Sequence, residues 1–201
     1  MILVSLWIGI LLLSGIKVRH FLILCLLFAL IFSFSWQFAL QDYQKERIIT
    51  FVAPQLADPL AEGWSQAQSK IAIGSGSFFG KGFSKGSQTQ YGFLPEPQTD
   101  FIFAAIGEEF GFLGVLIVLI LFLILFWRII KIAIMSQSNF PRLFTSGFSI
   151  LLIIQIFIHI GMNLGIFPII GIPLPLISYG GSSLILTFFG IGIIQNIKAN
   201  P

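Results

Sequence analysis

Residues 101–127 read FIFAAIGEEFGFLGVLIVLILFLILFW, and they decide what kind of protein this is. After Glu109 the stretch contains no charged side chain, and the next one along the chain is Arg128. A helix of this length would extend about 40 Å, whereas the hydrocarbon core of a bilayer is about 30 Å thick. The stretch therefore predicts a transmembrane helix that spans with tilt, in an all-α integral membrane protein.

The composition of the whole chain supports a membrane protein. Of its 201 residues, 56% are hydrophobic and only 9% are charged, whereas a soluble domain has about 25% charged residues. The net charge of +3 comes from basic residues scattered along the chain, a pattern that does not indicate nucleic-acid binding. Cys25 is the single cysteine and lies in a hydrophobic run. Because there is only one cysteine, an internal disulfide and a thiolate metal cluster are excluded.

Further spans are predicted by four more hydrophobic blocks, which are Met1–Ile16, Phe21–Leu40, Leu143–Gly165 and Leu176–Ile197. The first is short, because a helix of that length reaches only about 24 Å. We therefore predict about five transmembrane helices. Two would lie in residues 1–40, an extracytoplasmic loop with short helices and a glycine-rich segment would occupy residues 41–100, and three more would lie in residues 101–201.

The charges indicate how the chain is oriented in the membrane. The links between the blocks and the C-terminal tail carry only basic residues, which are Lys17, Arg19, Arg128, Lys131, Arg142 and Lys198. Every acidic residue lies between Asp42 and Glu109. Because cytoplasmic loops are enriched in Lys and Arg, residues 17–20, residues 128–142 and the C-terminus are expected inside. The polar segment 41–100 is expected outside.

The polar segment contains two predicted short helices, Gln41–Val52 and Glu62–Ile73, followed by the glycine-rich sequence GSGSFFGKG at residues 74–82. This sequence lacks the Gly-Lys-Ser/Thr ending of a nucleotide-binding P-loop. Two interpretations remain open. The segment is either a flexible loop at the level of the lipid headgroups, or a backbone cradle in which Lys81 and Lys85 face an anionic headgroup or diphosphate.

Asp100 stands at the entrance to the hydrophobic block, and the pattern leaves its role open. Either Thr99 or Asp100 caps the helix N-terminus, where the helix dipole favours negative charge, or the membrane edge raises the pKa of Asp100 and makes it a general base. Glu108 and Glu109 lie two turns further along the same helix. Acids at that depth face a cavity or a partner, and a helix–helix ion pair is the expected arrangement.

A series of short motifs follows in order along the chain. They are DYQKER at 42–47, QSKIAIGSG at 68–76, FGKG at 79–82, FLPE at 93–96, TDFIF at 99–103, GEE at 107–109, PIIGIPLP at 168–175 and SYGGS at 178–182. Together they resemble the SEDS family (shape, elongation, division and sporulation) in its RodA-like branch. The family fold has ten spanning helices and a large extracytoplasmic loop between the seventh and eighth. The resemblance implies a partial SEDS fold, with this chain supplying about the last five helices as the C-terminal part of a longer protein.

The resemblance also implies an enzyme, a peptidoglycan glycosyltransferase of the cell-elongation machinery that joins disaccharide units from lipid II into glycan strands. The family's essential aspartate falls on Asp100, which would act as the general base. Substrate contacts are implied for Arg47, Gln68, Lys70, Lys81, Gln90, Glu96, Thr99, Ser178 and Tyr179. A divalent cation, Mg²⁺ or Mn²⁺, or basic side chains such as Lys81 would stabilise the departing diphosphate, and no nucleotide is required.

The resemblance further implies a multi-pass protein of the bacterial cytoplasmic (inner) membrane. Its expected partners are a class B penicillin-binding protein that acts as transpeptidase, other membrane proteins of the elongation complex, lipid II and the membrane lipid. At three positions the sequence departs from the family pattern: Gly92 replaces a frequent acid, Gln98 a common His, and His159 an Asn or Val.

Two other classes of function stay open from the residues alone. One is a flippase for the lipid precursor, with Gln155 and His159 lining a route through the membrane, although interhelical hydrogen bonds are the expected role of these two side chains. The other is an inactive structural subunit that activates a partner. A polymerase would depend on Asp100, whereas a flippase would depend on polar groups at mid-membrane.

Overall fold

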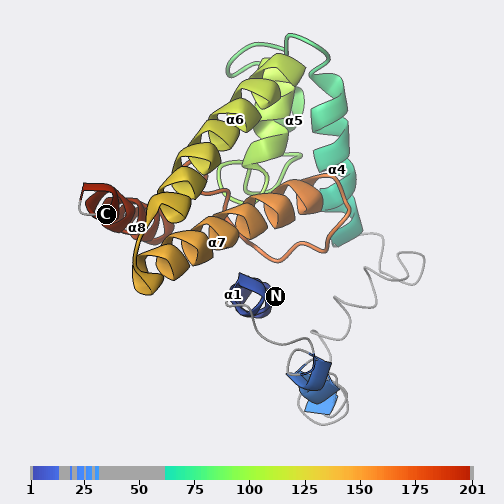
Figure 1. The fold of residues 1–201 in the computed structure, drawn as a ribbon. Coiled ribbons are helices and arrows are strands. Elements are labelled where there is room, and N and C mark those ends of the chain that lie inside the picture. Colours follow the sequence, from blue (N-terminus) through green and yellow to red (C-terminus); the bar gives the residue numbers. More distant parts are fainter. Residues whose placement is uncertain are drawn as a thin grey trace.

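The computed structural model of the protein describes residues 2–13, 19, 22–24, 26–28, 30–31 and 62–199. In this part of the chain the regular elements are helices, and Figure 1 labels them α1 (Ile2–Leu13), α4 (Glu62–Ser75), α5 (Ser87–Gln90), α6 (Ile102–Met135), α7 (Asn139–Asn163) and α8 (Gly181–Ala199). The all-α class is therefore confirmed. The predicted helix 41–52 lies outside the described residues, as does most of the predicted span 21–40.

Among the described helices, α6, α7 and α8 are long and apolar enough to cross a membrane. The prediction of a loop over residues 128–142 is wrong, because Arg128 and Lys131 lie on α6 and Arg142 lies on α7. Only residues 136–138 connect the two helices. The apolar sequence continues past Arg128 to Met135, so the helix continues as well, and long basic side chains can reach the headgroups from a helix end.

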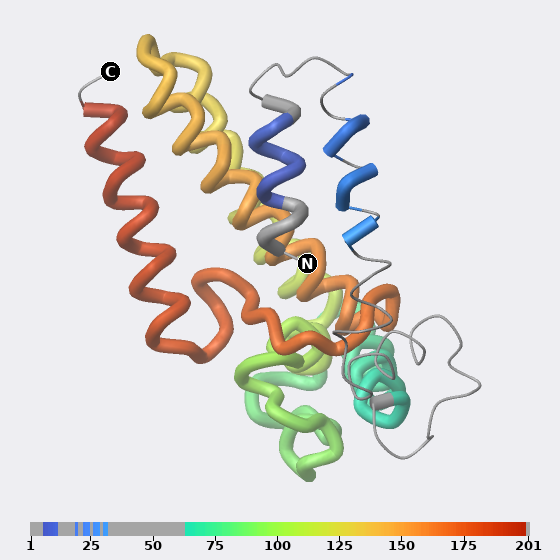
Figure 2. The backbone as a smooth tube through the Cα atoms, turned by 90° about the horizontal axis from the view of Figure 1, so that it is seen from below, coloured from blue at the N-terminus to red at the C-terminus, as the bar shows by residue number. Residues whose placement is uncertain are grey.

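The α6–α7 hairpin is the centre of the fold. Figure 1 shows the two helices diverging from their connection like a V, and α4, which contacts both, lies across the open end. Figure 2 shows α8 on one side of α7 and α1 on the other. Two clusters of buried side chains join the long helices, one of Phe122, Ile156 and Leu174 and one of Ile129, Leu152 and Ile194. Many outward apolar side chains stay exposed, as expected where lipid is the solvent.

Helix α4 confirms the predicted helix 62–73 and extends it to Ser75. Its inner face is made of small residues, because Ser69 and Ala72 are completely buried whereas Trp64 and Ile71 on the opposite face are exposed. The residue after the helix, Gly76, lies so close to α6 that an added Cβ would collide with a backbone carbonyl of that helix. Small side chains therefore allow α4 to pack tightly on the N-terminal part of α6.

The long helix α6 is interrupted at Gly111, where φ is 66° and ψ is −163°, a conformation that is essentially restricted to glycine. A break in a helix leaves backbone groups without their usual partners. The glycine-rich segment supplies some of these partners. The amides of Phe112 and Leu113 donate hydrogen bonds to the carbonyls of Ser77 and Phe78, at 3.0 and 3.2 Å.

The same segment also donates hydrogen bonds to α6. The amides of Lys81 and Gly82 bind the carbonyls of Glu108 and Glu109, at 3.0 and 2.9 Å. Residues 74–82 are thus bonded to α6, and the interpretation as a flexible loop is wrong. The amides of Lys81 and Gly82 are occupied by α6 and cannot bind an anion, whereas a role for the Lys81 and Lys85 side chains towards an anion stays a prediction.

Replacing Gly111 with alanine is expected to destabilise the protein by at least about 1–3 kcal/mol, the cost of a strained backbone conformation. The new Cβ would also lie 2.8 Å from the carbonyl carbon and oxygen of Phe78, which is too close for ordinary contact. Thermal unfolding in detergent measures the change. The matched control is Gly192→Ala in α8, where an added Cβ meets nothing within 4 Å and alanine favours the helix. Equal melting temperatures for the two variants would contradict this account of the kink.

Candidate active site

Asp100 lies two residues before the start of α6, outside the spanning segment. Its side chain is half-buried beside Gly171, where a Cβ would stand 3.6 Å from Oδ2. Neither Asp100 nor Thr99 caps the helix, because Phe101 is the capping residue and makes no side-chain cap bond. Among the described residues no group donates a hydrogen bond to the Asp100 carboxylate, and the capping interpretation is wrong.

Two effects raise the pKa of the Asp100 carboxyl above its usual value of 3.8. The larger is burial, which penalises the charged form, and the smaller is the negative charge of Glu96. A carboxylate with a raised pKa binds a proton more strongly. This makes Asp100 a better general base than a fully solvated aspartate.

The backbone around Asp100 is held by the proline-rich loop before α8. The Ser178 hydroxyl donates a hydrogen bond to the carbonyl of Thr99 at 2.8 Å and accepts one from the amide of Leu174, also at 2.8 Å. The amide of Tyr179 donates to the carbonyl of Gln98 at 2.9 Å. Residues far apart in the sequence are therefore joined at the position of the candidate base.

Asn163, at the end of α7, also forms hydrogen bonds to the backbone around Asp100. Its Nδ2 donates a hydrogen bond to the Asp100 carbonyl at 3.0 Å, and its Oδ1 accepts one from the Ala104 amide at 3.2 Å. The Ser69 hydroxyl of α4 donates to the Asn163 carbonyl at 2.8 Å. Asn163 is completely buried and so connects α4, α6 and α7 under Asp100.

Sequence reasoning missed Asn163, although one signal was present. An amide at the end of an apolar helix is costly unless it is bonded, and Asn163 stands one turn after His159 on the same face of α7. His159 itself donates from Nδ1 to the carbonyl of Ile172 at 2.8 Å. The partner of Nδ1 is thus a loop carbonyl and not a group on another helix, whereas Nε2 is buried without a partner among the described residues.

Glu108, in the N-terminal part of α6, is the second polar centre and is completely buried. Oε1 accepts hydrogen bonds from Lys81 Nζ at 2.8 Å and from the Gln88 amide at 2.9 Å. Oε2 accepts from the Thr89 amide at 3.0 Å and the Thr89 hydroxyl at 2.7 Å. An ion pair was predicted, but its basic partner comes from the glycine-rich segment and not from another helix. Glu108 therefore fastens residues 81–89 to α6.

The remaining predicted site residues are distributed around this centre. Gln68 and Lys70 lie on α4, and the Lys70 side chain covers Gly165. Gln90, on α5, lines a cavity of about 420 Å³ together with Gln98 and Glu109. Arg47 lies outside the described residues. In the described part of the chain, no group of three or more His, Cys, Asp and Glu side chains could hold a metal ion.

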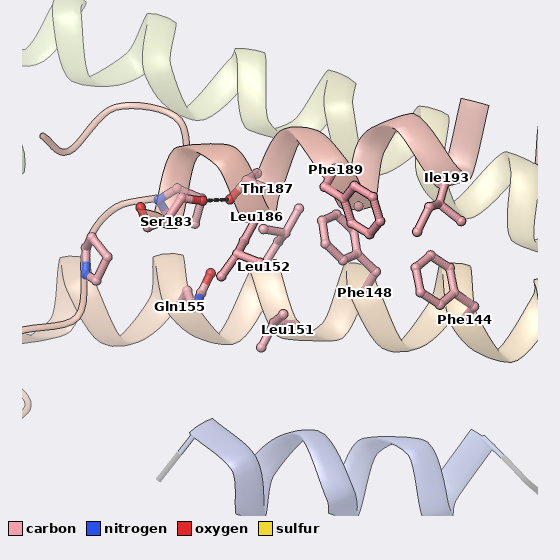
Figure 3. A pocket seen from close by; sticks show the side chains of 13 residues that line it. Phe144, Phe148, Leu151, Leu152, Gln155, Ser183, Leu186, Thr187, Phe189 and Ile193 are labelled. Carbon is pink, nitrogen blue, oxygen red and sulfur yellow. Dashed lines mark hydrogen bonds between the residues drawn. The ribbon is translucent and has the colours of Figure 1, made fainter. Parts of the chain in front are cut away.

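A separate cavity of about 370 Å³ lies between α7 and α8 and is shown in Figure 3. Its walls are mainly apolar, with Phe144, Phe148 and Leu152 on α7 and Phe189 on α8. The one hydrogen bond drawn there joins the Thr187 hydroxyl to the carbonyl of Ser183, at 2.7 Å. Gln155 also lines this cavity, but the apolar walls suit a hydrocarbon chain and not a charged headgroup.

Comparison with known proteins gives a consistent result. The model of the FtsW/RodA/SpoVE family, described as cell cycle proteins, matches residues 1–201. The peptidoglycan glycosyltransferase MrdB of Escherichia coli K12 is 44% identical over 191 residues, which are 95% of this chain and 51% of that protein. The peptidoglycan glycosyltransferase RodA of Treponema pallidum is 43% identical over 160 residues, which are 80% of this chain and 37% of that protein.

A solved structure is similar as well. It is described as the structural coordination of polymerization and crosslinking by a peptidoglycan synthase complex. The matched chain of that structure is 32% identical in sequence to this one, with a TM-score of 0.74. The match covers 96% of this chain and 52% of that one. The chain thus spans about half the length of the curated relatives first matched.

Proposed function

Because this chain belongs to the FtsW/RodA/SpoVE (SEDS) family, we propose that it is part of a peptidoglycan glycosyltransferase that polymerises lipid II during cell elongation. The observation that carries the proposal is the Asp100 carboxylate. It is half-buried and has a raised pKa, and hydrogen bonds from Ser178 and Asn163 to adjacent carbonyls fix its backbone. It is the arrangement that a positioned general base requires.

The reaction is a single displacement at a sugar carbon. The Asp100 carboxylate takes the proton from the 4-hydroxyl of the acceptor sugar, and the oxygen forms a bond to the anomeric carbon of the donor. The bond from that carbon to the lipid diphosphate breaks, and the diphosphate leaves with the electron pair. An α-linked donor gives a β-linked product by inversion. The leaving group already carries the activation, so no nucleotide is needed.

The departing diphosphate requires positive charge. Lys81, one of the proposed substrate contacts, already forms an ion pair with Glu108 at 2.8 Å. Its side chain is 30% exposed, so it can contact a diphosphate only while it stays paired with Glu108. A divalent cation, Mg²⁺ or Mn²⁺, would neutralise charge on the leaving group if the substrate phosphates supplied most of its oxygen ligands. In the described part of the chain no cluster of three or more His, Cys, Asp and Glu side chains could hold it, and the Asp100 carboxylate has to stay unligated to act as the base.

We place the protein in the bacterial cytoplasmic (inner) membrane, with residues 41–100 outside and the C-terminus in the cytoplasm. The supporting observation is the restriction of acidic residues to the range 42–109, with only basic residues on the other side. We propose a class B penicillin-binding protein as partner, which the likeness to a chain of a peptidoglycan synthase complex supports.

The test is synthesis of glycan strands by the protein reconstituted in liposomes with purified lipid II and Mg²⁺, with and without the transpeptidase partner. Polymers separated by electrophoresis are expected. Movement of fluorescent lipid II between leaflets without any polymer would instead favour the flippase. If synthesis required this chain but continued unchanged when Asp100 was replaced, the result would favour the structural subunit.

Replacing Glu96 with glutamine is expected to shift the pH dependence of polymerisation towards lower pH. The negative charge of Glu96 raises the pKa of Asp100, so removing that charge lowers the pKa. Because the base acts only when ionised, the rate falls on acidification at a lower pH than in the wild type. Initial rates across a pH series measure the midpoint, and Glu62→Gln is the control. A midpoint that stays in place or moves to higher pH would contradict the role of Asp100 as the titrating group.

A further inference from the structure

A cluster of basic side chains lines a cavity at the end of the molecule that is remote from Asp100. Arg128 and Lys131 of α6 and Lys198 of α8 border a space of about 550 Å³, a volume within the usual range of ligand sites. The cavity lies near the α6–α7 connection, where Figure 2 also shows the C-terminal end of α8. Glycan synthesis as proposed above makes no use of it.

The residues that line this cavity come from one face of α6 and from the last turn of α8. On α6, Arg128 is followed by Lys131, Ile132 and Met135, which are three, four and seven positions further along and therefore share one face. On α8, Lys198 lies three positions after Gln195, which also lines the cavity. Each helix thus turns polar groups and apolar side chains towards the same space.

No Asp or Glu is among the described residues that line the cavity. No Asp or Glu follows Glu109 in the sequence, and the ion pair that the described residues form is the one between Lys81 and Glu108. Arg128, Lys131 and Lys198 are exposed. An anionic ligand is the natural complement of three such cations at one site.

The apolar part of the lining indicates that this ligand also has a hydrocarbon portion. Leu125, Ile132 and Ile197 border the same cavity. Trp127, next to Arg128, is 74% exposed, and exposed Trp is typical of the membrane–water interface. A free phosphate would match the cations only, whereas a phospholipid would match both parts of the lining.

We propose that this cavity binds the phosphate headgroup of an anionic phospholipid, with its acyl chains continuing along the apolar side of α6 and α8. Arg128, Lys131 and Lys198 bind the phosphate, and the ligand comes from the leaflet at the α6–α7 connection. Basic cavities between transmembrane helices are known sites for such headgroups. The site is independent of the glycosyltransferase proposal and of the orientation of the chain.

The experiment is native mass spectrometry of the purified protein exchanged into detergent with phosphatidylglycerol or phosphatidylcholine. The wild type is expected to retain phosphatidylglycerol in preference. The triple variant Arg128→Gln, Lys131→Gln, Lys198→Gln is expected to bind it about tenfold or more weakly, and Lys198→Gln alone about fivefold more weakly. The single variant, at the end of a helix, keeps the test valid if the triple variant fails to fold.

Arg142→Gln is the matched control. Arg142 lies at the same end of the molecule on α7 and bonds Asn139 Oδ1 at 3.2 Å, but it does not line the cavity. Retention of phosphatidylglycerol by this variant supports the proposal, and an equal loss overturns it by showing that only the overall charge matters. Equal retention of both lipids by the wild type, or displacement by millimolar inorganic phosphate, also overturns it.

Discussion

Asp100→Asn is expected to lower the rate of glycan synthesis by about a hundredfold or more, the usual contribution of a general base. Asparagine keeps the shape of the side chain but cannot accept the proton of the sugar hydroxyl. Among the described residues no group donates a hydrogen bond to the Asp100 carboxylate, and the hydrogen bond from Asn163 is made to the main-chain carbonyl. The melting temperature should therefore change little while the rate falls.

The measurement is the initial rate of polymer formation from lipid II by protein reconstituted in liposomes. Asp58→Asn makes the same chemical change elsewhere in the segment 41–100 and serves as the control. Lipid II binding is measured in parallel, because a loss of binding alone would mimic a loss of chemistry. Wild-type rates with Asp100→Asn would remove the basis of the proposed mechanism.

Glu108→Ala is expected to destabilise the protein by about 3–5 kcal/mol, the cost of breaking a buried ion pair by removing one partner. The change leaves Lys81 without its carboxylate and leaves the amides of Gln88 and Thr89 without their acceptor. Each orphaned donor adds a desolvation cost. Segment 81–89 should also detach from α6, which limited proteolysis detects alongside thermal unfolding.

The adjacent Glu109→Ala is the control for this variant. Glu109 is only half-buried, and its main-chain carbonyl, which binds Gly82, is unchanged by the substitution. A stability change within about 0.5–1 kcal/mol is expected. Similar losses for the two glutamates would mean that the hydrogen bonds to Glu108 do not hold the segment in place.

The sequence predicted the helices that are recognised by one local property, a long run of apolar side chains. The apolar run after Glu109 and the apolar blocks around residues 143–165 and 176–197 are long enough to span, and α6, α7 and α8 are found there. Their boundaries were less accurate. Helix α8 begins only at Gly181, because Leu176 adopts a positive φ of 66° and lies in a turn over residues 175–177 that is followed by a bend at 178–179. Hydrophobicity reports burial in lipid but not the conformation of the backbone.

The sequence placed Asp100 at the edge of a span but could not choose between a cap and a base. The choice depends on which groups surround the carboxylate, and these come from distant positions. Asn163 and Ser178 bind the carbonyls on either side, and Gly171 adjoins the carboxylate itself. No local pattern encodes such contacts, because they exist only after α7 and the proline-rich loop have packed against residues 98–101.

The sequence by itself thus predicted a membrane protein, the three long apolar helices that could cross the membrane, and the polar residues of the candidate site. Only the tertiary structure decided that Glu108 takes its cation from the glycine-rich segment, that this segment repairs the break at Gly111, and that no described residue donates a hydrogen bond to the Asp100 carboxylate. The reason is physical. The free energy of transferring a segment into lipid is a sum over side chains that are neighbours in the sequence. Hydrogen-bond partners and pKa values instead depend on the geometry between residues far apart in the chain.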